Sequence, residues 1–417
     1  MTLCRHGVAV TLLEAAPRLG GRARALALDG LRVDNGQHLL VGAYHGVREL
    51  LVELGISEDR VFRRHPLRLD MRSAQRPWRL RLPRLPAPLH LLAGLLGARG
   101  LDPGERYRAL RLCLALARPR AARDEDPPLG EFLRDHGQGE ALQQRLWEPL
   151  CLALLNTPLA LASTRVFATT LRAVFLHRRR DSDLLIPRGD LDAVLPAPAR
   201  DFLQRHGATV RLRCRARRLL VSQGRLRGVV TADGEQYLAE ETVLALPPAE
   251  CLRLIRDEPA CAGLRRQLEA LRHAPICTAY LRYPPGVHLD QPMVGLLDGL
   301  GQWLFDRGYS GTPGIMAVVI SGPGPHVAWP RARLARRIQE ELADYFPRWP
   351  PPERSWIIRE KRATFLCQHG VEELRPGVRS PLPHGWLAGD YLDTGYPATL
   401  EGAVRSGRQC AHAILAR

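Results

Sequence analysis

The chain has 417 residues, of which 45% are hydrophobic and 25% charged, and these values exclude both a single small module and wholesale disorder. Lys and Arg number 60 against 43 Asp and Glu, and the resulting net charge of +17 raises nucleic acid or an anionic membrane as partners. Because Lys361 is the only lysine, the excess is arginine and indicates the coding bias of a GC-rich genome, and no nucleic-acid-binding motif accompanies it.

The nine cysteines are scattered, and no pair has the two-residue spacing of a metal-binding or redox motif. We therefore expect a reduced, cytoplasmic protein without a metal site. No apolar run reaches the roughly 18 residues that span a bilayer, and residues 1–20 lack the pattern of a signal peptide. The chain is expected to be soluble or peripheral on a membrane.

The first strong pattern lies near the start of the chain. Val8–Leu13 is a β-branched apolar run that predicts a buried parallel strand, and Glu14 stands at its carboxyl end. A carboxylate in that place can bond a ribose hydroxyl, while Gly20 and Gly21 let the backbone approach a phosphate that Arg22 would bind. The alternative is a surface turn in which the acid caps a helix.

Arginine is concentrated between Arg60 and Arg84, where Asp70 is the only acidic residue. Trp78–Leu82 alternates apolar and basic side chains, which predicts a strand with one apolar and one basic face. The basic face is either simply solvated or attracted to anionic lipid head groups. The leucine-rich stretch Leu89–Leu96 that follows favours the peripheral membrane contact.

Helical and extended blocks follow in order. The patterns predict helices over 89–97, 103–117, 129–136 and 139–155. From residue 208 the period changes to two and predicts a meander of strands over 209–214, 217–222, 225–232 and 235–239, then a buried strand over 241–246. Later we expect strands near 274–283 and 314–321 and a helix near 332–345.

The end of the chain carries the second strong pattern. A short predicted strand, Trp386–Asp390, ends in Gly389 and Asp390, and a helix is expected over Ala398–Leu415. Such an acid can bond a ribityl hydroxyl or a phosphate, and a helix amino terminus stabilises negative charge, as on a reduced flavin ring. The alternative is a capped helix packed on a sheet.

Further motifs lie between these ends: Val33-Asp-Asn-Gly-Gln-His-Leu-Leu40 with Gly42-Ala-Tyr44, Trp147-Glu-Pro-Leu-Cys151, Leu155-Asn-Thr-Pro158, Trp303-Leu-Phe-Asp306 and Glu360-Lys-Arg-Ala-Thr-Phe365. With the two ends, they make the sequence resemble the FAD-dependent amine oxidase and phytoene desaturase superfamily. Within it, the sequence is most similar to the squalene-associated branch, the hydroxysqualene dehydroxylases. The resemblance extends over essentially the whole chain.

The resemblance implies an α/β fold in which a Rossmann-like FAD-binding lobe (1–60, 186–260 and 384–417) is interleaved with an α+β substrate lobe (61–185 and 261–383). It implies these cofactor contacts: Glu14 at the adenosine ribose; Arg18, Gly20, Gly21 and Arg22 at the pyrophosphate; Gly36, Gln37 and His38 at the isoalloxazine; Ala216 at the adenine; and Gly389, Asp390, Ala398 and Glu401 around the flavin pocket.

His38 is the one candidate catalytic residue, as a proton donor to a departing hydroxyl. The alternative is a histidine that merely bonds a backbone carbonyl. Trp303, Phe305, Tyr391 and Tyr396 could offer aromatic faces to a carbocation, or could be ordinary core residues.

The implied activity is reductive dehydroxylation of hydroxysqualene to squalene in hopanoid or triterpene biosynthesis. The expected partners are a long apolar isoprenoid substrate, an unidentified electron donor and an anionic membrane surface, at the inner face of the cell membrane. The alternatives are a carotenoid or isoprenoid desaturase and a flavin-free, non-catalytic chain.

One departure from the superfamily pattern concerns the start of the chain. Such folds begin with a strand and Gly-x-Gly-x-x-Gly, whereas Thr2–His6 and Gly7 predict the last turn of a helix. We therefore expect that the sequence as written is truncated by a start codon assigned too far downstream.

Overall fold

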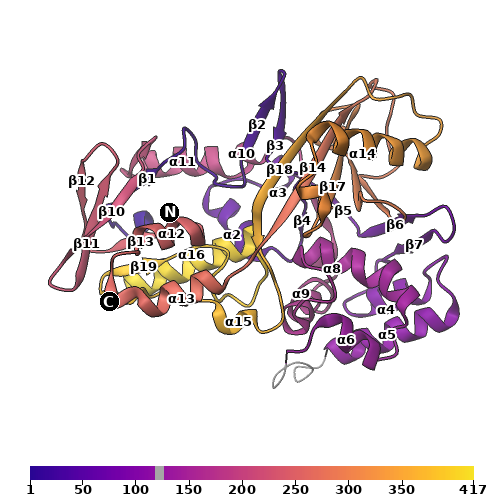
Figure 1. The fold of residues 1–417 in the computed structure, drawn as a ribbon, viewed down its shortest axis with the longest axis horizontal. Helices are drawn as coiled ribbons and strands as arrows, with labels where there is room; N and C mark the ends of the chain where they lie inside the picture. Colours follow the sequence, from indigo (N-terminus) through magenta and orange to yellow (C-terminus); the bar gives the residue numbers. More distant parts are fainter. Residues whose placement is uncertain (118–125) are drawn as a thin grey trace.

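The computed structural model spans the whole chain, and the structure describes residues 1–117 and 126–417. Figure 1 shows two lobes between which the chain passes several times, with both chain ends in the lobe on the left. The left lobe is built from small sheets and helix α16, and the right lobe from one seven-stranded sheet and a group of helices. The fold belongs to the α/β class.

The left lobe contains two short parallel ladders, β1–β9 and β13–β19, and an antiparallel meander, β10–β11–β12. Its long helix begins where the Thr399 hydroxyl accepts a hydrogen bond from the backbone N of Gly402. The strands are β1 (Thr11–Glu14), β9 (Thr209–Leu212), β10 (Ala216–Ser222), β11 (Arg225–Thr231), β12 (Gln236–Leu238), β13 (Thr242–Leu244) and β19 (Gly385–Leu387). The helices are α1 (Thr2–Arg5), α11 (Pro196–Arg205), α12 (Pro248–Leu254), η3 (Pro259–Cys261), α13 (Ala262–Ala270) and α16 (Leu400–Leu415).

The sheet of the right lobe has the order β18-β14-β17-β16-β15-β6-β7. Helix α14 covers it with Leu334, Ile338 and Leu342, which recur at helical spacing and are buried. The strands are β6 (Arg68–Arg72), β7 (Trp78–Arg81), β14 (His273–Arg282), β15 (Met293–Leu296), β16 (Trp303–Asp306), β17 (Ile315–Ser321) and β18 (Arg354–Phe365). The helices beside them are η4 (Arg307–Ser310), η5 (Pro325–Val327) and α14 (Arg331–Tyr345).

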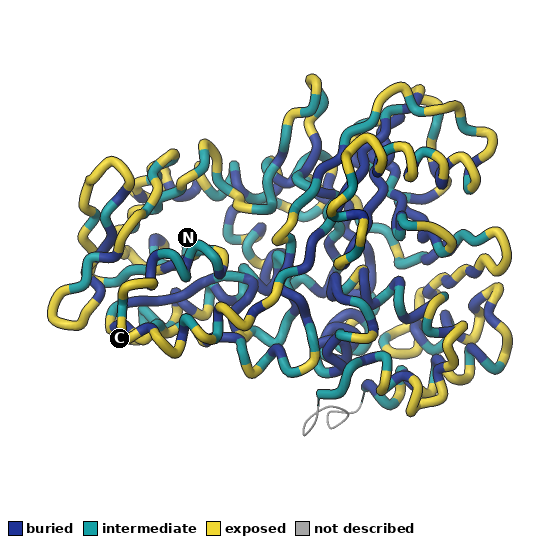
Figure 2. Tube along the Cα trace, in the orientation of Figure 1, coloured by how far each residue is buried: buried dark blue, intermediate teal, exposed yellow. Residues whose placement is uncertain are grey.

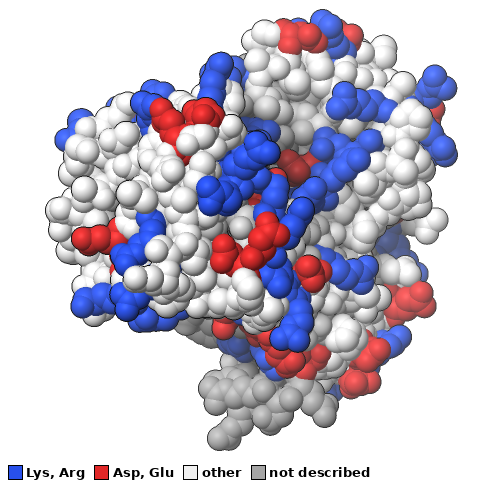
Figure 3. All heavy atoms as spheres, turned by 60° about the vertical axis from the view of Figure 1, so that its left-hand side comes forward, with Lys and Arg blue, Asp and Glu red and all other residues white. Residues whose placement is uncertain are grey.

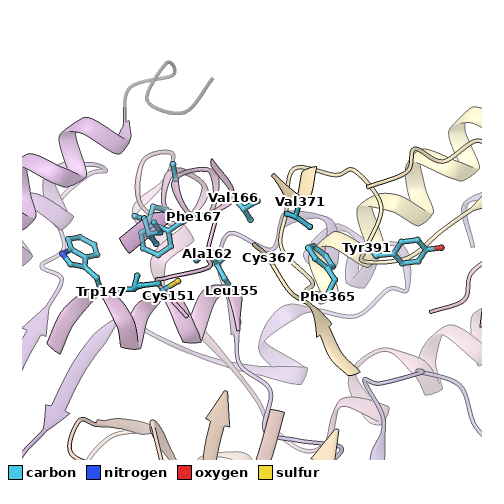
Figure 4. Close-up of a cluster of buried hydrophobic side chains, with 14 of the residues drawn as sticks. Trp147, Cys151, Leu155, Ala162, Val166, Phe167, Phe365, Cys367, Val371 and Tyr391 are labelled. Atoms are coloured by element: carbon cyan, nitrogen blue, oxygen red, sulfur yellow. The ribbon is translucent and has the colours of Figure 1, made fainter. Parts of the chain in front are cut away.

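A group of helices fills the lower part of the right lobe. They are α4 (Leu89–Leu96), α5 (Pro103–Ala117), α6 (Leu129–Asp135), α7 (Glu140–Leu142), η1 (Gln143–Trp147), α8 (Glu148–Leu155) and α9 (Thr164–Phe175), with α15 (Val371–Leu374) near them. Figure 4 shows their core, in which Trp147 and Phe167 meet edge to face with ring centroids 6.4 Å apart. The same cluster continues to Cys367 and Val371, so one apolar core joins the helices to the carboxyl-terminal third of the chain.

Short elements lie at the junction of the lobes: β2 (Ala25–Leu28), β3 (Leu31–Asp34), β4 (Leu40–Val41), α2 (His45–Glu53), α3 (Glu58–Val61), β5 (Phe62–His65), η2 (Arg179–Ser182), β8 (Leu184–Pro187) and α10 (Leu191–Val194). Strand β8 pairs with both β4 and β5. The lobe boundary expected at residue 60 therefore falls just before a strand that belongs to this junction.

Most of the elements expected from the sequence are confirmed, including the turn of helix at the start of the chain, where Gly7 has a φ of +76°. The strand expected over 8–13 is parallel as predicted, but it covers Thr11–Glu14 and is only partly buried. One strand of the predicted meander is wrong: 209–214 is β9, which pairs in parallel with β1 instead of with β10. Alternation shows that a segment is extended but does not identify its partner strand. Figure 2 shows the turns of the remaining meander exposed at the far left.

Candidate active site

A cavity of about 420 Å³ lies where the two lobes meet. Its polar side is formed by the loop after β1, the turn after β3 and the segment before α16, and its apolar side by α8, α9 and strands of the large sheet. Figure 3 shows Lys and Arg side chains along the groove between the lobes, with several Asp and Glu side chains among them. The cavity therefore combines a polar wall with an interior that suits a hydrocarbon.

The turn after β3 forms much of the polar side. Gly36 has a φ of +98°, a conformation that glycine adopts without strain. Asn35 donates from Nδ2 to Glu360 Oε2 at 3.2 Å, and the backbone N of Gln37 donates to Thr278 Oγ1 at 3.4 Å. These bonds tie the turn to β18 and β14 and fix the backbone that faces the cavity.

A buried ion pair supports the turn from behind. The side chains of Asp34 and Arg307 are 0% and 2% exposed, and Asp34 Oδ2 lies 3.4 Å from an Arg307 guanidinium nitrogen. The same guanidinium donates to Gln37 Oε1 at 3.1 Å, while Asp34 Oδ1 accepts from the backbone N of Leu191 at 2.7 Å. Because either charge alone would be costly in this place, the pair binds the turn firmly to η4 and α10.

His38 lies on the cavity wall next to this turn. Its Nδ1 lies 2.8 Å from the backbone oxygen of Gly36, so the carbonyl bond considered from the sequence is confirmed. Burial lowers the pKa of His38 below its usual value of 6.5, and the charges of Arg307 and Arg22 act in the same direction, against that of Asp34. Burial therefore favours the neutral ring, and the contact at Nδ1 favours the tautomer that leaves Nε2 as an acceptor.

Arg22 and Asp390, from opposite ends of the chain, meet at the cavity wall. Arg22 forms a 2.7 Å ion pair with Asp390 Oδ1 and also donates to the backbone oxygen of Ala363 at 2.5 Å. The Arg22 side chain lines the cavity and is 35% exposed, although both of its terminal nitrogens have partners within the chain. Gly20, on the same wall, has a φ of +108°, and a Cβ there would come within 2.6 Å of the Ala23 oxygen. The two ends that the sequence indicated are thus brought together.

Glu401 holds two helices together, and its predicted contact with a cofactor stays a prediction. Glu401 is fully buried and is not part of the cavity wall, although Ala398 is. Its two carboxylate oxygens accept from the backbone N of Gly46 and Val47, each at 3.0 Å, in the first turn of α2. Glu401 therefore caps α2 and fastens it to α16, because a carboxylate is stabilised at a helix amino terminus.

Five other residues predicted at the cofactor are absent from the cavity wall: Glu14, Arg18, Gly21, Ala216 and Gly389. Glu14 accepts from the backbone N of Ala16 at 2.7 Å, and Gly389 donates from its backbone N to Ser406. Their contacts with a cofactor stay predictions. The wall does include Gly20, Arg22, Gly36, Gln37, His38, Asp390 and Ala398.

The apolar side of the cavity continues into the helices. Its wall is formed mainly by Leu67, Leu69, Leu150, Leu154, Leu171, Val174, Phe175, Met293, Trp303 and Phe305. A smaller cavity of about 50 Å³ shares Leu67, Leu69, Leu150, Leu171 and Phe175 with it and extends toward α4 and α5. We call the apolar side of the main cavity and this smaller cavity together the apolar channel. Of the aromatic candidates, Tyr396 also lines the main cavity, whereas Tyr391 is buried outside the wall.

Two supporting residues were missed from the sequence. Asn156 ends α8 with a φ of +51°, donates to Thr364 Oγ1 at 2.9 Å and accepts from the backbone N of Gly322 at 2.6 Å. Arg307 forms the buried pair described above. Asn156 stands inside a quoted motif, but its partners are distant in sequence, and Arg307 is one arginine among many, so no local pattern distinguished either.

Within the part of the chain that the structure describes, no group of three or more His, Cys, Asp or Glu could hold a metal ion. No helix of those residues has the length and apolar character needed to cross a bilayer.

Comparison with known proteins places these features in context. A model of the family described as flavin containing amine oxidoreductase matches residues 1–415. A hydroxysqualene dehydroxylase from Rhodopseudomonas palustris is 31% identical over 99% of this chain and 94% of its own. A zeta-carotene desaturase from Arabidopsis thaliana is 23% identical over 99% of this chain and 82% of its own. Among solved structures, cyclohexylamine oxidase from Brevibacterium oxydans has the same fold, with a TM-score of 0.71, 20% identity, and coverage of 100% of this chain and 96% of that one.

Proposed function

The chain belongs to the flavin containing amine oxidoreductase family, and from this we propose that it is a FAD-dependent oxidoreductase that converts hydroxysqualene to squalene. The observation that carries the proposal is the cavity, whose polar wall around Gly36 and Arg22 opens into the apolar channel. The 31% identity with a hydroxysqualene dehydroxylase over nearly the whole chain supports this substrate.

The polar side of the cavity fits a flavin. Gly36 lacks a Cβ and is held by the Asp34–Arg307 pair through Gln37, so a flat ring can lie against the backbone there. Ala398 on the same wall directly precedes the Thr399 cap of α16, whose positive dipole end suits negative charge on such a ring. The partly exposed Arg22 suits a phosphate. We propose that Glu14 and Arg18 complete the nucleotide part of the site, which favours FAD over a smaller flavin.

The proposed reaction replaces a C–O bond of the substrate with a C–H bond and releases water, so it consumes two electrons and two protons. A reduced flavin supplies the hydride, and an external electron donor restores it. The apolar channel binds the hydrocarbon chain and excludes water, while Trp303 and Phe305 present aromatic faces to positive charge on the reacting carbon. Neutral His38 holds the hydroxyl by accepting its hydrogen bond at Nε2, and it can donate a proton only after taking one up.

We further propose that the two lobes divide the work along the expected boundaries, with 1–60, 186–260 and 384–417 binding the cofactor and 61–185 and 261–383 binding the substrate. A substrate of this kind dissolves in membranes, so the enzyme would act in the cytoplasm in peripheral contact with the anionic inner face of the cell membrane. Hopanoid or triterpene biosynthesis would use its product.

The test is product analysis under anoxic conditions. Purified protein is loaded with FAD, reduced with dithionite and incubated with hydroxysqualene, and the extract is examined by mass spectrometry. Squalene in amounts that exceed the enzyme is the expected result. Absence of squalene, with the flavin bound and reduced, would contradict the proposed substrate.

A carotenoid or isoprenoid desaturase is the second candidate, favoured by the 23% identity with a zeta-carotene desaturase. The same preparation with oxidised flavin and phytoene or zeta-carotene distinguishes it, since a desaturase would lengthen the conjugated system and shift its visible absorption. A third candidate is a chain that binds no flavin. A colourless protein that stays colourless after incubation with FAD would support that one.

A further inference from the structure

Exposed apolar side chains gather on one part of the helical region. Among the described residues, five of the large exposed apolar side chains lie between residues 85 and 114: Leu85, Leu89, Leu96, Tyr107 and Leu114. Leu89 and Leu96 are 52% and 55% exposed and stand seven residues apart in α4, and Tyr107 and Leu114 have the same spacing in α5. Since residues seven apart share a helix face, each helix presents an apolar stripe to the outside.

The two helices are fastened to each other, and both turn their buried faces to the smaller cavity, so both stripes point away from it. Arg106 of α5 donates to the backbone oxygens of Leu101 at 2.9 Å and of Leu96, the last residue of α4, at 3.0 Å. Figure 1 shows α4 and α5 side by side at the lower right edge of the molecule, far from both chain ends.

The surface around these stripes is strongly basic. Five arginines between residues 81 and 114 are exposed: Arg81, Arg84, Arg99, Arg108 and Arg111. Within the same range Asp102 is the one exposed acidic residue, because Glu105 is buried and paired with Arg145 at 2.9 Å. Exposed apolar side chains and arginines in one segment are the composition that binds an anionic lipid surface, with the apolar groups entering the acyl boundary and the cations meeting phosphates.

This surface overlaps the arginine-rich stretch, which first indicated a membrane, only at Arg81 and Arg84. In β7 the apolar side chains Trp78 and Leu80 are buried in the core, and only the basic face points outward. That stretch supplies charge without apolar anchors. The anchors come from the α4–α5 surface that follows it.

The inner faces of the same two helices line the apolar channel. Leu91 and Leu95 of α4 and Cys113 and Leu116 of α5 form part of the wall of the smaller cavity. A single layer of helix therefore separates the exposed leucines from the channel that leads to the polar turn. The outer face of these helices suits contact with lipid, and the inner face suits a hydrocarbon substrate that has passed from the lipid into the channel.

We propose that the exposed face of residues 81–114 is the surface by which the protein docks on an anionic lipid membrane, and that the apolar substrate enters the channel between α4 and α5. Docking stands independently of the reaction, whereas the identity of the entering molecule rests on the proposed function. Charge favours lipid over a second copy of the chain, because a symmetric dimer through this face would bring its arginines together.

Docking is tested by flotation with two kinds of vesicle, pure phosphatidylcholine and phosphatidylcholine mixed with phosphatidylglycerol. The wild-type protein is expected to float with the mixed vesicles, and L89S/L96S to bind them at least about tenfold more weakly, since two apolar anchors are lost. The matched control V52S/L238S changes side chains that are 76% and 73% exposed elsewhere and should float like the wild type.

The charge contribution has its own pair of variants. R84Q/R99Q should lose much of the preference for the anionic vesicles, whereas R217Q/R218Q, exposed on β10, should keep it. Equal flotation of L89S/L96S and the wild type would overturn the proposal. A second outcome would also overturn it: in gel filtration the wild type is a dimer and L89S/L96S a monomer, while neither protein binds vesicles. The face would then join two copies of the chain.

Entry is tested with L95W, which places a bulky side chain between α4 and the channel while leaving the outer face unchanged. Flotation should match the wild type, and the variant should still unfold cooperatively at a temperature lowered by the extra volume in the core. Transfer of an apolar fluorophore such as diphenylhexatriene from vesicles into the protein should slow severalfold. Unchanged transfer would overturn entry between the helices, and L91W offers an independent repeat. If hydroxysqualene is not converted, the proposed function fails, but flotation and fluorophore transfer still decide this proposal.

Discussion

At the scale of single residues, buried charges hold the wall of the cavity in place. Glu401 accepts two backbone hydrogen bonds at the start of α2 and also forms a 2.6 Å ion pair with Arg405. The Asp34–Arg307 pair likewise stabilises the turn at Gly36. Such groups contribute chiefly because their removal leaves buried partners unsatisfied.

The substitution E401Q tests this directly. A side-chain amide keeps one acceptor but turns a donor toward a backbone N–H and leaves Arg405 without a counter-charge, so we expect the free energy of unfolding to fall by about 2–3 kcal/mol. Urea denaturation measures the change. The control E49Q alters a side chain that is 61% exposed and paired with Arg408, and it should cost under about 1 kcal/mol. Equal effects of the two variants would refute the capping role.

Arg22 offers a test of the cofactor site. R22Q removes the partly exposed cation proposed for the phosphates and leaves Asp390 without its 2.7 Å partner. The dissociation constant for FAD, measured by flavin fluorescence, should rise about tenfold or more, as expected for the loss of charge-assisted hydrogen bonds. R218Q, exposed on β10, serves as the control. An unchanged FAD affinity in R22Q would remove Arg22 from the proposed site.

The buried environment of His90 leads to a prediction of how stability depends on pH. His90 is fully buried, its Nε2 lies 3.2 Å from Ser182 Oγ, and its pKa is lowered from 6.5 by burial and by Arg179, against Asp183. As the pH falls below 6.5, the unfolded chain takes up a proton that the folded chain resists, so stability decreases. In urea denaturation at about pH 7.5 and 5.5, H90Q should lose less stability than the wild type. An equal loss in both proteins would show that His90 does not contribute.

The sequence could identify the residue types at the cavity but not how they are supported. Gly36, His38 and Asp390 stand in local motifs, and all three line the wall. Glu401 stands in such a motif too, yet its partners at the start of α2 lie 355 and 354 residues earlier in the chain. A carboxylate in a motif can bind a ligand or cap a helix, and only its neighbours in space distinguish the two.

At the scale of elements, the junction between β4 and η2 depends on the absence of a side chain. A Cβ at Gly42 would overlap the backbone oxygen of Arg180, and the Gly42 backbone N donates to Asp183 at 2.8 Å. These contacts hold β4 and η2 beside the cavity, whose wall includes Val41 and Ser182.

The variant G42A should therefore lose several kcal/mol of stability, because the overlap is with backbone and can be relieved only by moving an element. G263A is the matched control: nothing lies within 4 Å of a Cβ at Gly263 in α13, and alanine there should add up to about 1 kcal/mol. Thermal unfolding compares the two. Tolerance of G42A would show that β4 and η2 are free to separate.

Periodicity predicts most elements well, as with α14 and the strands β14 and β17, because one buried face repeats at a fixed spacing. Periodicity does not predict which strand a given strand pairs with. Strand β9 was assigned to the meander, yet it pairs with β1, nearly two hundred residues earlier in the chain. Register with a distant strand depends on packing that no local window contains.

At the scale of the whole molecule, function depends on how the lobes share one cavity. Its wall takes Gly20 and Asp390 from the ends of the chain and Leu150, Phe175 and Trp303 from its middle. The resemblance to a superfamily predicted that these segments interleave, and composition alone did not. Part of the arginine excess behind the net charge of +17 lies on the α4–α5 surface, and basic side chains also lie in the groove of Figure 3.

The most direct test of the central claim is an anoxic absorption measurement. Protein loaded with FAD is bleached with one equivalent of dithionite, and hydroxysqualene is then added. The account predicts that the visible flavin band returns, with about one squalene formed for each flavin reoxidised, since the reaction consumes two electrons. A band that stays bleached in the presence of hydroxysqualene, and returns only on admission of air, would contradict it.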